Sequence, residues 1–202
     1  MGRLKELLVS PSIAIRNGKR EKDIIKTLEI LIVTWFLFAI SALLVATKVL
    51  PTFTAVGMFL LILFLGIVCS AFCGYLITVI TNTLGGKGKY YGGLTTITYS
   101  SFPLSIGSLI TAFLSLIHPA LSAVLGFILI AVTAALSFSI YFRSIKEFFA
   151  TDMITTFISF IITVYVFAVA IYGAILFSVA GLAPVLQSTN IETILRTIRP
   201  FP

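Results

Sequence analysis

The chain has 202 residues, of which 59% are hydrophobic and only 10% are charged. A soluble domain carries about 25% charged residues, so this composition excludes a soluble fold and predicts an integral membrane protein. The net charge of +7 does not indicate nucleic-acid binding. Seven of the 14 Lys and Arg residues fall in the N-terminal segment that ends at Lys26. No aromatic residue stands there to stack on a base, and such a cluster beside an apolar run typically faces anionic lipid.

The N-terminal segment is expected to lie at the membrane surface. Leu4, Leu7 and Leu8 share one face of a short initial helix, which we expect to lie in the interface. Pro11 ends that helix, and a basic stretch over 16–23 leads to the first span.

Uncharged runs downstream are long enough to cross a bilayer, which needs about 20 apolar residues in one helix. Charges, Pro51 and the pair His118-Pro119 separate these runs. The expected spans are at about 25–48, 54–83, 93–117, 120–143 and 152–179. They form a membrane domain over 24–180, between a basic cytoplasmic segment over 1–23 and an extracytoplasmic amphipathic tail over 181–202. The predicted fold is an all-α membrane protein, a bundle of five transmembrane helices with amphipathic interfacial helices at both ends.

The distribution of basic residues predicts the orientation. The N-terminal segment, the loop 84–92 and the loop 143–151 hold seven, two and two basic residues, and the other side holds three. The positive-inside rule then places the N-terminus in the cytoplasm and the C-terminus outside. The expected location in a prokaryote is the cell membrane, with Arg143 and Lys146 in the second cytoplasmic loop.

The sequence contains no pattern typical of a catalytic or metal-binding site. Cys69 and Cys73 stand four apart in an apolar run, where Cys is usually a small packing residue. His118 has no Cys, Asp or Glu beside it to complete a metal site. No charged residue falls in the middle of an expected span, where ion-coupled transporters and intramembrane enzymes place such groups. We therefore expect no enzyme, no metal and no cofactor.

The stretch 84–103, LGGKGKYYGGLTTITYSSFP, holds the charges Lys87 and Lys89 between two long uncharged runs. It fails as a phosphate-binding P-loop, because neither lysine is followed by Ser or Thr. One interpretation is a flexible cytoplasmic turn with basic and aromatic anchors. The other is a docking loop for lipid headgroups or a protein partner, in which glycines expose backbone N–H groups. The docking candidates, with two from the later loop, are Gly85, Gly86, Lys87, Lys89, Tyr90, Tyr91, Arg143 and Lys146.

Two further patterns concern helix packing. The third span is rich in hydroxyls and contains a proline, which removes a helical hydrogen bond. Its polar or kinked face comprises Thr98, Tyr99, Ser100, Ser101 and Pro103. This face either packs on other spans or lines a polar permeation path. In the second span, small residues recur every four positions and let another helix approach closely; this ridge comprises Gly66, Ser70 and Gly74.

The same stretch, 84–103, resembles the Yip1 family of five-span membrane proteins. The resemblance rests on a Gly-Gly turn with Lys and aromatic residues, followed by a Thr-rich start and a Tyr-Ser-x-x-Pro pattern from Tyr99 to Pro103. The short apolar helix before Pro11 and the turn at 140–148 are similar to the family as well. The chain lacks the long N-terminal region and the Asp-Leu-Tyr-Gly motif of eukaryotic members, and looks more like the short archaeal or bacterial branch.

The resemblance implies a non-enzymatic protein that acts by association; eukaryotic members are linked with prenylated small GTPases and vesicle traffic. We expect an adaptor or accessory subunit of a transporter or trafficking-type assembly. The expected partners are other membrane proteins, in homo- or hetero-oligomers, and anionic lipid headgroups at the basic face. The alternatives are a permeation protein that uses the polar face of the third span, and a membrane-shaping protein that binds lipid through its amphipathic ends.

Overall fold

A computed structural model describes residues 2–48 and 51–165 of the chain. Over these ranges the chain is helical and contains no strand. The helices are α1 (Gly2–Val9), α2 (Pro11–Glu21), α3 (Ile24–Ala46), α4 (Thr52–Thr83), α5 (Tyr90–Ile117) and α6 (Pro119–Phe149), followed by the shorter apolar helix Met153–Tyr165. The chain divides into two compact units, Met1–Ser159 and Phe160–Pro202, and α1 to α6 all belong to the first.

Four helices of the described part are long and apolar enough to cross a membrane. They are α3, α4, α5 and the stretch Ser122–Phe149 of α6, with 23, 32, 28 and 28 residues, and about 20 are needed. These helices confirm an all-helical membrane protein. The fifth expected span, 152–179, begins as the helix Met153–Tyr165 and then leaves the described residues. The expected amphipathic tail, 181–202, also lies outside them.

Helix α6 extends further than the sequence predicted. The expected loop over 143–151 is wrong, because Arg143 and Lys146 lie on α6, which continues to Phe149. In this extension Ile145 and Phe149 are fully buried, while the two basic residues are exposed. One apolar face packed against the protein is enough to keep a helix folded beyond its lipid-spanning part.

The basic N-terminal segment also folds differently from the prediction. The basic stretch is a helix, α2, with Pro11 in its first turn and Ala14, Ile15 and Gly18 buried. In α1, Leu7 is 1% exposed but Leu8 is 50% exposed. The expectation that these leucines share one lipid-facing surface is therefore wrong, because Leu7 packs into the protein core.

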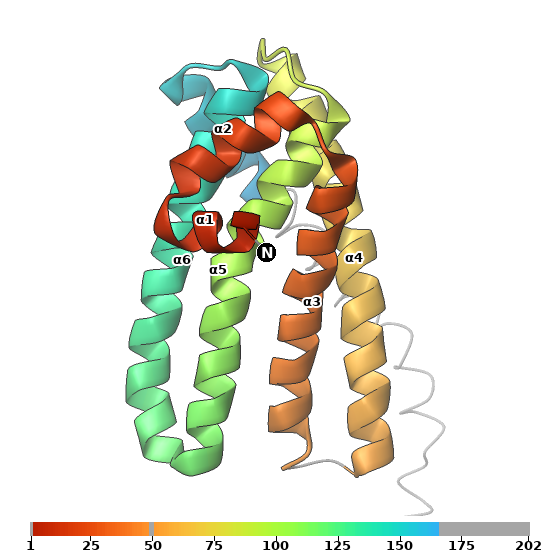
Figure 1. The fold of residues 1–202 in the computed structure, drawn as a ribbon, viewed down its shortest axis with the longest axis vertical. Helices are drawn as coiled ribbons and strands as arrows, with labels where there is room; N and C mark the ends of the chain where they lie inside the picture. Colours follow the sequence, from red (N-terminus) through yellow and green to blue (C-terminus); the bar gives the residue numbers. More distant parts are fainter. Residues whose placement is uncertain (1, 49–50, 166–202) are drawn as a thin grey trace, which may run out of the picture. The chain divides into compact units, whose positions relative to one another are not determined.

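Figure 1 shows the arrangement of the first unit. Helices α3 to α6 run side by side, and α1 and α2 lie across α5 and α6 near one end of them. Contacts join α1 to α2 and α2 to α6. A cluster of buried residues connects these short helices to the bundle; it comprises Leu7, Ala14, Ile15, Ile30, Tyr99, Phe102 and Ile140. We call α1, α2, the α4–α5 loop and the last two turns of α6 the headpiece.

Glycines allow a close contact between α4 and α5. A Cβ atom added at Gly93 would overlap the backbone carbonyl oxygen of Gly74, and one added at Gly74 would lie 2.8 Å from the Cα of Leu94. Further along α4, the Trp35 ring covers Gly66, and the Trp35 Nε1 donates a hydrogen bond to Ser70 at 2.7 Å. The small-residue ridge of α4 thus faces α3 and α5 of the same chain.

Candidate functional site: two basic pockets of the headpiece

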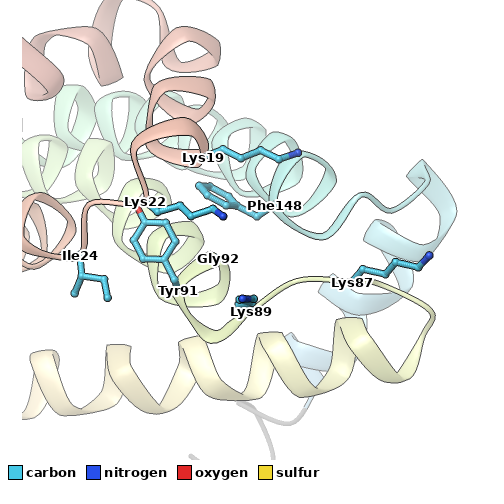
Figure 2. A pocket seen from close by; sticks show the side chains of 8 residues that line it. All are labelled: Lys19, Lys22, Ile24, Lys87, Lys89, Tyr91, Gly92 and Phe148. Atoms are coloured by element: carbon cyan, nitrogen blue, oxygen red, sulfur yellow. The ribbon is translucent and has the colours of Figure 1, made fainter.

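Four lysines from two parts of the chain line a pocket of about 390 Å³ in the headpiece. Figure 2 shows this lysine pocket, which is lined by Lys19, Lys22, Ile24, Lys87, Lys89, Tyr91, Gly92 and Phe148. Helix α2 supplies Lys19, the residue directly after it is Lys22, and the α4–α5 loop supplies Lys87 and Lys89. The rings of Tyr91 and Phe148 meet edge to face, with centroids 6.0 Å apart, and form an aromatic wall.

A second pocket, of about 230 Å³, lies between α2 and α6. We call it the arginine pocket; it is lined by Ser12, Ile15, Arg16, Arg143, Lys146 and Glu147. The structure therefore divides the docking candidates between two sites. Lys87, Lys89 and Tyr91 line the lysine pocket, Arg143 and Lys146 line the arginine pocket, and Gly85, Gly86 and Tyr90 line neither.

The glycine-rich loop is held by hydrogen bonds to its neighbours. The side chain of Asn82 accepts from the N–H of Gly88 at 3.0 Å and donates to its carbonyl at 2.9 Å. The N–H of Gly86 donates to Thr81, and that of Lys87 donates to the carbonyl of Phe149 at 3.0 Å. The N–H of Gly85 also donates to the carbonyl of Asn82 at 3.1 Å. The expectation that these glycines offer backbone N–H groups to an anion is therefore wrong at Gly85, Gly86 and Gly88, whose N–H groups are already used.

We expect Asn82→Ala to loosen this loop, because it removes both hydrogen bonds to Gly88. The free energy of unfolding should fall by about 1 kcal/mol, and trypsin should cut faster after Lys87 and Lys89 in detergent-purified protein. Asn82→Asp keeps the acceptor but loses the donor. Its cleavage rate should therefore lie between the rates of wild type and Asn82→Ala. Equal cleavage of wild type and Asn82→Ala would show that this clamp does not order the loop.

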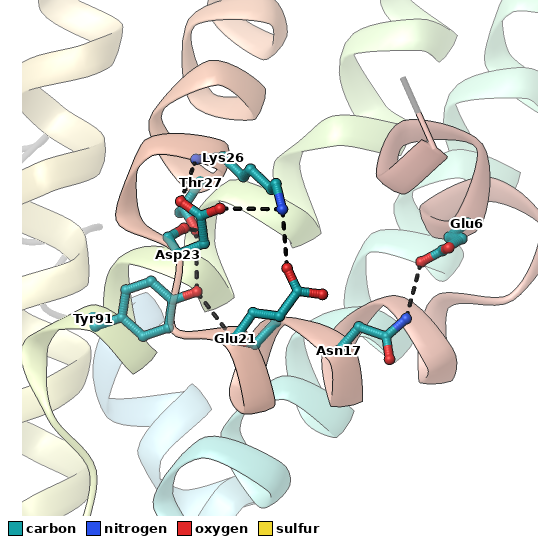
Figure 3. Close-up of polar contacts among 8 residues, drawn as sticks. Glu6, Asn17, Glu21, Asp23, Lys26, Thr27 and Tyr91 are labelled. Atoms are coloured by element: carbon teal, nitrogen blue, oxygen red, sulfur yellow. Dashed lines mark hydrogen bonds and ion pairs between the residues drawn. The ribbon is translucent and has the colours of Figure 1, made fainter.

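The junction between α2 and α3 fixes Lys22 at the edge of the lysine pocket. Lys22 has a φ of 48° in the left-handed region, which normally favours Gly after a helix. Its N–H donates to the carbonyl of Gly18 at 3.1 Å, and the hydroxyl of Tyr91 donates to the same carbonyl at 3.1 Å. Helix α5 thereby holds the end of α2 through one side chain, as Figure 3 shows.

The acids beside Lys22 are paired elsewhere. Lys26 lies 3.0 Å from Glu21 and 3.2 Å from Asp23 (Figure 3). These pairs are exposed and contribute little stability. They do, however, place a cation beside both carboxylates that flank Lys22 in sequence.

The charges of the lysine pocket are only partly compensated. Lys19 lies 3.8 Å from Glu147 in an ion pair between α2 and α6. Among the residues that the structure describes, Lys22, Lys87 and Lys89 pair with no carboxylate. The pocket therefore carries a net positive charge and favours an anion.

The hydroxyl-rich face of α5 lies away from both pockets, inside the bundle. Thr98, Tyr99, Ser100 and Pro103 are buried. The hydroxyls of Thr98, Ser100 and Ser101 donate to carbonyls of their own helix at 2.8, 3.1 and 2.8 Å, and α5 continues through Pro103. Hydroxyls bonded in this way satisfy a helix in lipid, so the arrangement favours packing over a permeation path.

Sequence reasoning missed the contributions of Lys22 and Phe148 to the lysine pocket. The position of Lys22 depends on α2, which was not predicted, and that of Phe148 depends on the continuation of α6. The sequence nevertheless contained a signal for α2. A proline such as Pro11 is common in the first turn of a helix, and the apolar pair Ala14-Ile15 that follows can form its buried face. Recognising that helix would have placed Lys22 at its end.

A protein-family model described as the Yip1 domain matches residues 5–177. The matched range includes both pockets and the whole stretch 84–103 that carries the resemblance. No curated protein and no solved structure gives a match.

Proposed function

The chain belongs to the Yip1 domain family, and we propose from this premise that it is a non-enzymatic adaptor or accessory subunit that associates with other membrane proteins. The observation that carries the proposal is the headpiece, which holds basic side chains on packed helices. Because Leu7 and Ile15 are buried in the core, α1 and α2 have a fixed support. A docking site on rigid elements can select its partner by geometry as well as by charge.

The arginine pocket is the surface that we assign to a protein partner. Arg16, Arg143 and Lys146 are exposed and come from two helices that contact each other. Arg guanidinium groups bind carboxylates through two parallel hydrogen bonds. This chemistry suits an acidic segment of a partner at the membrane surface.

The long helices support association over transport or catalysis. Helices α4 and α5 carry no charged residue along their length, although transport pathways usually contain such groups. We further propose that the headpiece faces the cytoplasm and that the protein resides in the cell membrane of a prokaryote. The support is the excess of basic residues on that side of the bundle.

Crosslinking in native membranes, followed by purification in mild detergent and mass spectrometry, tests this function. Wild type should recover a membrane protein in a defined ratio. Reversing the charges of the arginine pocket should reduce that recovery by roughly tenfold, because like charges then face each other. The variant combines Arg16→Glu, Arg143→Glu and Lys146→Glu.

The control reverses two basic residues, Lys5 and Arg20, to Glu, since both are exposed on the headpiece and line neither pocket. It should recover the partner as wild type does. A chain that stays alone after crosslinking would contradict the adaptor function. Equal recovery of the partner by wild type, the arginine-pocket variant and the control would show that the arginine pocket does not bind the partner.

A further inference from the structure

We propose that the lysine pocket is a binding site for a lipid headgroup that ends in a phosphomonoester. This inference goes beyond the association with proteins proposed above and does not depend on it, because it concerns a different pocket. Its volume of about 390 Å³ falls in the range of small-molecule sites, about 300 to 1,000 Å³. Basic pockets at the ends of transmembrane helices are a recurring form of headgroup site.

The charge of the pocket selects an anion with more than one negative charge. Lys22, Lys87 and Lys89 have no carboxylate partner in the described part of the chain. A phosphomonoester carries close to two negative charges at neutral pH and offers three oxygens, whereas a phosphodiester carries one charge. Lys binds phosphate as a compact charge with three donors, so several lysines around one group favour the phosphomonoester.

The backbone at Lys22 supports a binding role for this lysine. Its φ of 48° is a conformation that Gly adopts without steric cost, and the structure holds a long cationic side chain there instead. In Figure 2 the Lys22 side chain extends between the rings of Tyr91 and Phe148. A residue kept in an unfavourable conformation inside a pocket is a reason to look for a function of its side chain.

The walls of the pocket favour a lipid over a soluble phosphate. Ile24 is the first residue of α3, is 54% exposed and lines the pocket beside Tyr91 and Phe148. The pocket therefore lies where the candidate spans α3 and α5 begin and α6 ends. Aromatic and apolar side chains at that level match the glycerol and upper acyl region of a lipid, while the lysines match its headgroup.

Native mass spectrometry of the full-length protein in detergent tests the proposal with short-chain phosphatidic acid and phosphatidylglycerol. Phosphatidic acid ends in a phosphomonoester and phosphatidylglycerol contains a phosphodiester. We expect phosphatidic acid to bind about fivefold more tightly. Glycerol 3-phosphate, which has the same phosphomonoester without acyl chains, should bind much more weakly. Equal binding of the two lipids would overturn the proposed preference for a phosphomonoester. Binding of glycerol 3-phosphate as tight as that of phosphatidic acid would overturn the proposal that the ligand is a lipid.

Two pocket variants and one control locate the site. Lys22→Gly and Lys89→Gln should each weaken phosphatidic acid binding by about fivefold. Lys22→Gly should also unfold at the same temperature as wild type or higher, because Gly suits the left-handed backbone. The control Lys5→Gln removes an exposed headpiece charge outside the pocket and should bind as wild type does. Unchanged binding by both pocket variants, or an equal loss in the control, would overturn the site.

Discussion

Gly93→Ala should lower the free energy of unfolding by about 3 kcal/mol, a large effect for one methyl group. The added Cβ would overlap the carbonyl oxygen of Gly74 and the hydroxyl oxygen of Thr78 on α4. The first of these atoms belongs to the backbone, so α4 and α5 must separate to admit the methyl group. Transmembrane helices associate largely through such close packing, and every contact along the pair would weaken. Unfolding in detergent, followed by circular dichroism, measures the change.

Gly57→Ala is the matched control, because Gly57 lies on α4 and an added Cβ there would have no neighbour within 4 Å besides the adjacent residues and the backbone of its own helix. There the substitution should leave stability unchanged or raise it by up to about 1 kcal/mol, since Ala is the better helix former. The double variant Gly93→Ala with Thr78→Ala should remain destabilised, because the Gly74 carbonyl is still present. Full recovery in the double variant would show that the side chain of Thr78, and not the backbone approach, limits the contact.

The long helices could be predicted from the sequence because lipid imposes a simple requirement. A span needs a long uncharged run, and such runs place α3, α4 and α5 within about three residues of their observed ends. The resemblance carried by 84–103 is confirmed as well, because the Yip1 domain match covers residues 5–177. Both inferences use patterns that are local in the chain.

The headpiece could not be predicted in the same way, because its helices depend on tertiary contacts. Helix α2 is strongly basic, and only its burial of Ala14, Ile15 and Gly18 makes it part of a core. The lysine pocket joins Lys22 to Lys89, which are far apart in sequence. Lys89 stood out by its isolation in an uncharged region, but nothing local to Lys22 indicated that the two lysines line one pocket.

Tyr99→Ala should lower the free energy of unfolding by about 4 kcal/mol, as expected for removing a buried aromatic ring. Tyr99 is 0% exposed and is among the largest fully buried side chains of the described residues. It belongs to the same cluster as Leu7 and Ile15 of the headpiece. A Cβ added at Gly18 would lie 3.1 Å from the Tyr99 hydroxyl oxygen, so the ring lies directly beneath α2.

The cavity left by Tyr99→Ala should therefore release α1 and α2, whose buried residues pack in the same cluster, before the bundle unfolds. Trypsin digestion of detergent-purified protein reports this release, because α2 contains the cleavage sites Arg16, Lys19 and Arg20. Tyr99→Phe keeps the ring and should be cut at a rate close to that of wild type. Tyr75→Ala removes a ring of α4 that is 56% exposed and should change neither stability nor cleavage.

The same variant tests whether the lysine pocket depends on the packing of α2 over Tyr99. If α2 detaches, Lys19 and Lys22 leave the lysine pocket while Lys87 and Lys89 stay on their clamped loop. Phosphatidic acid binding by Tyr99→Ala should then fall at least as far as in Lys22→Gly. A Tyr99→Ala protein that is less stable, yet resists trypsin in α2 and binds phosphatidic acid as wild type does, would show that Tyr99 supports the bundle and not α2.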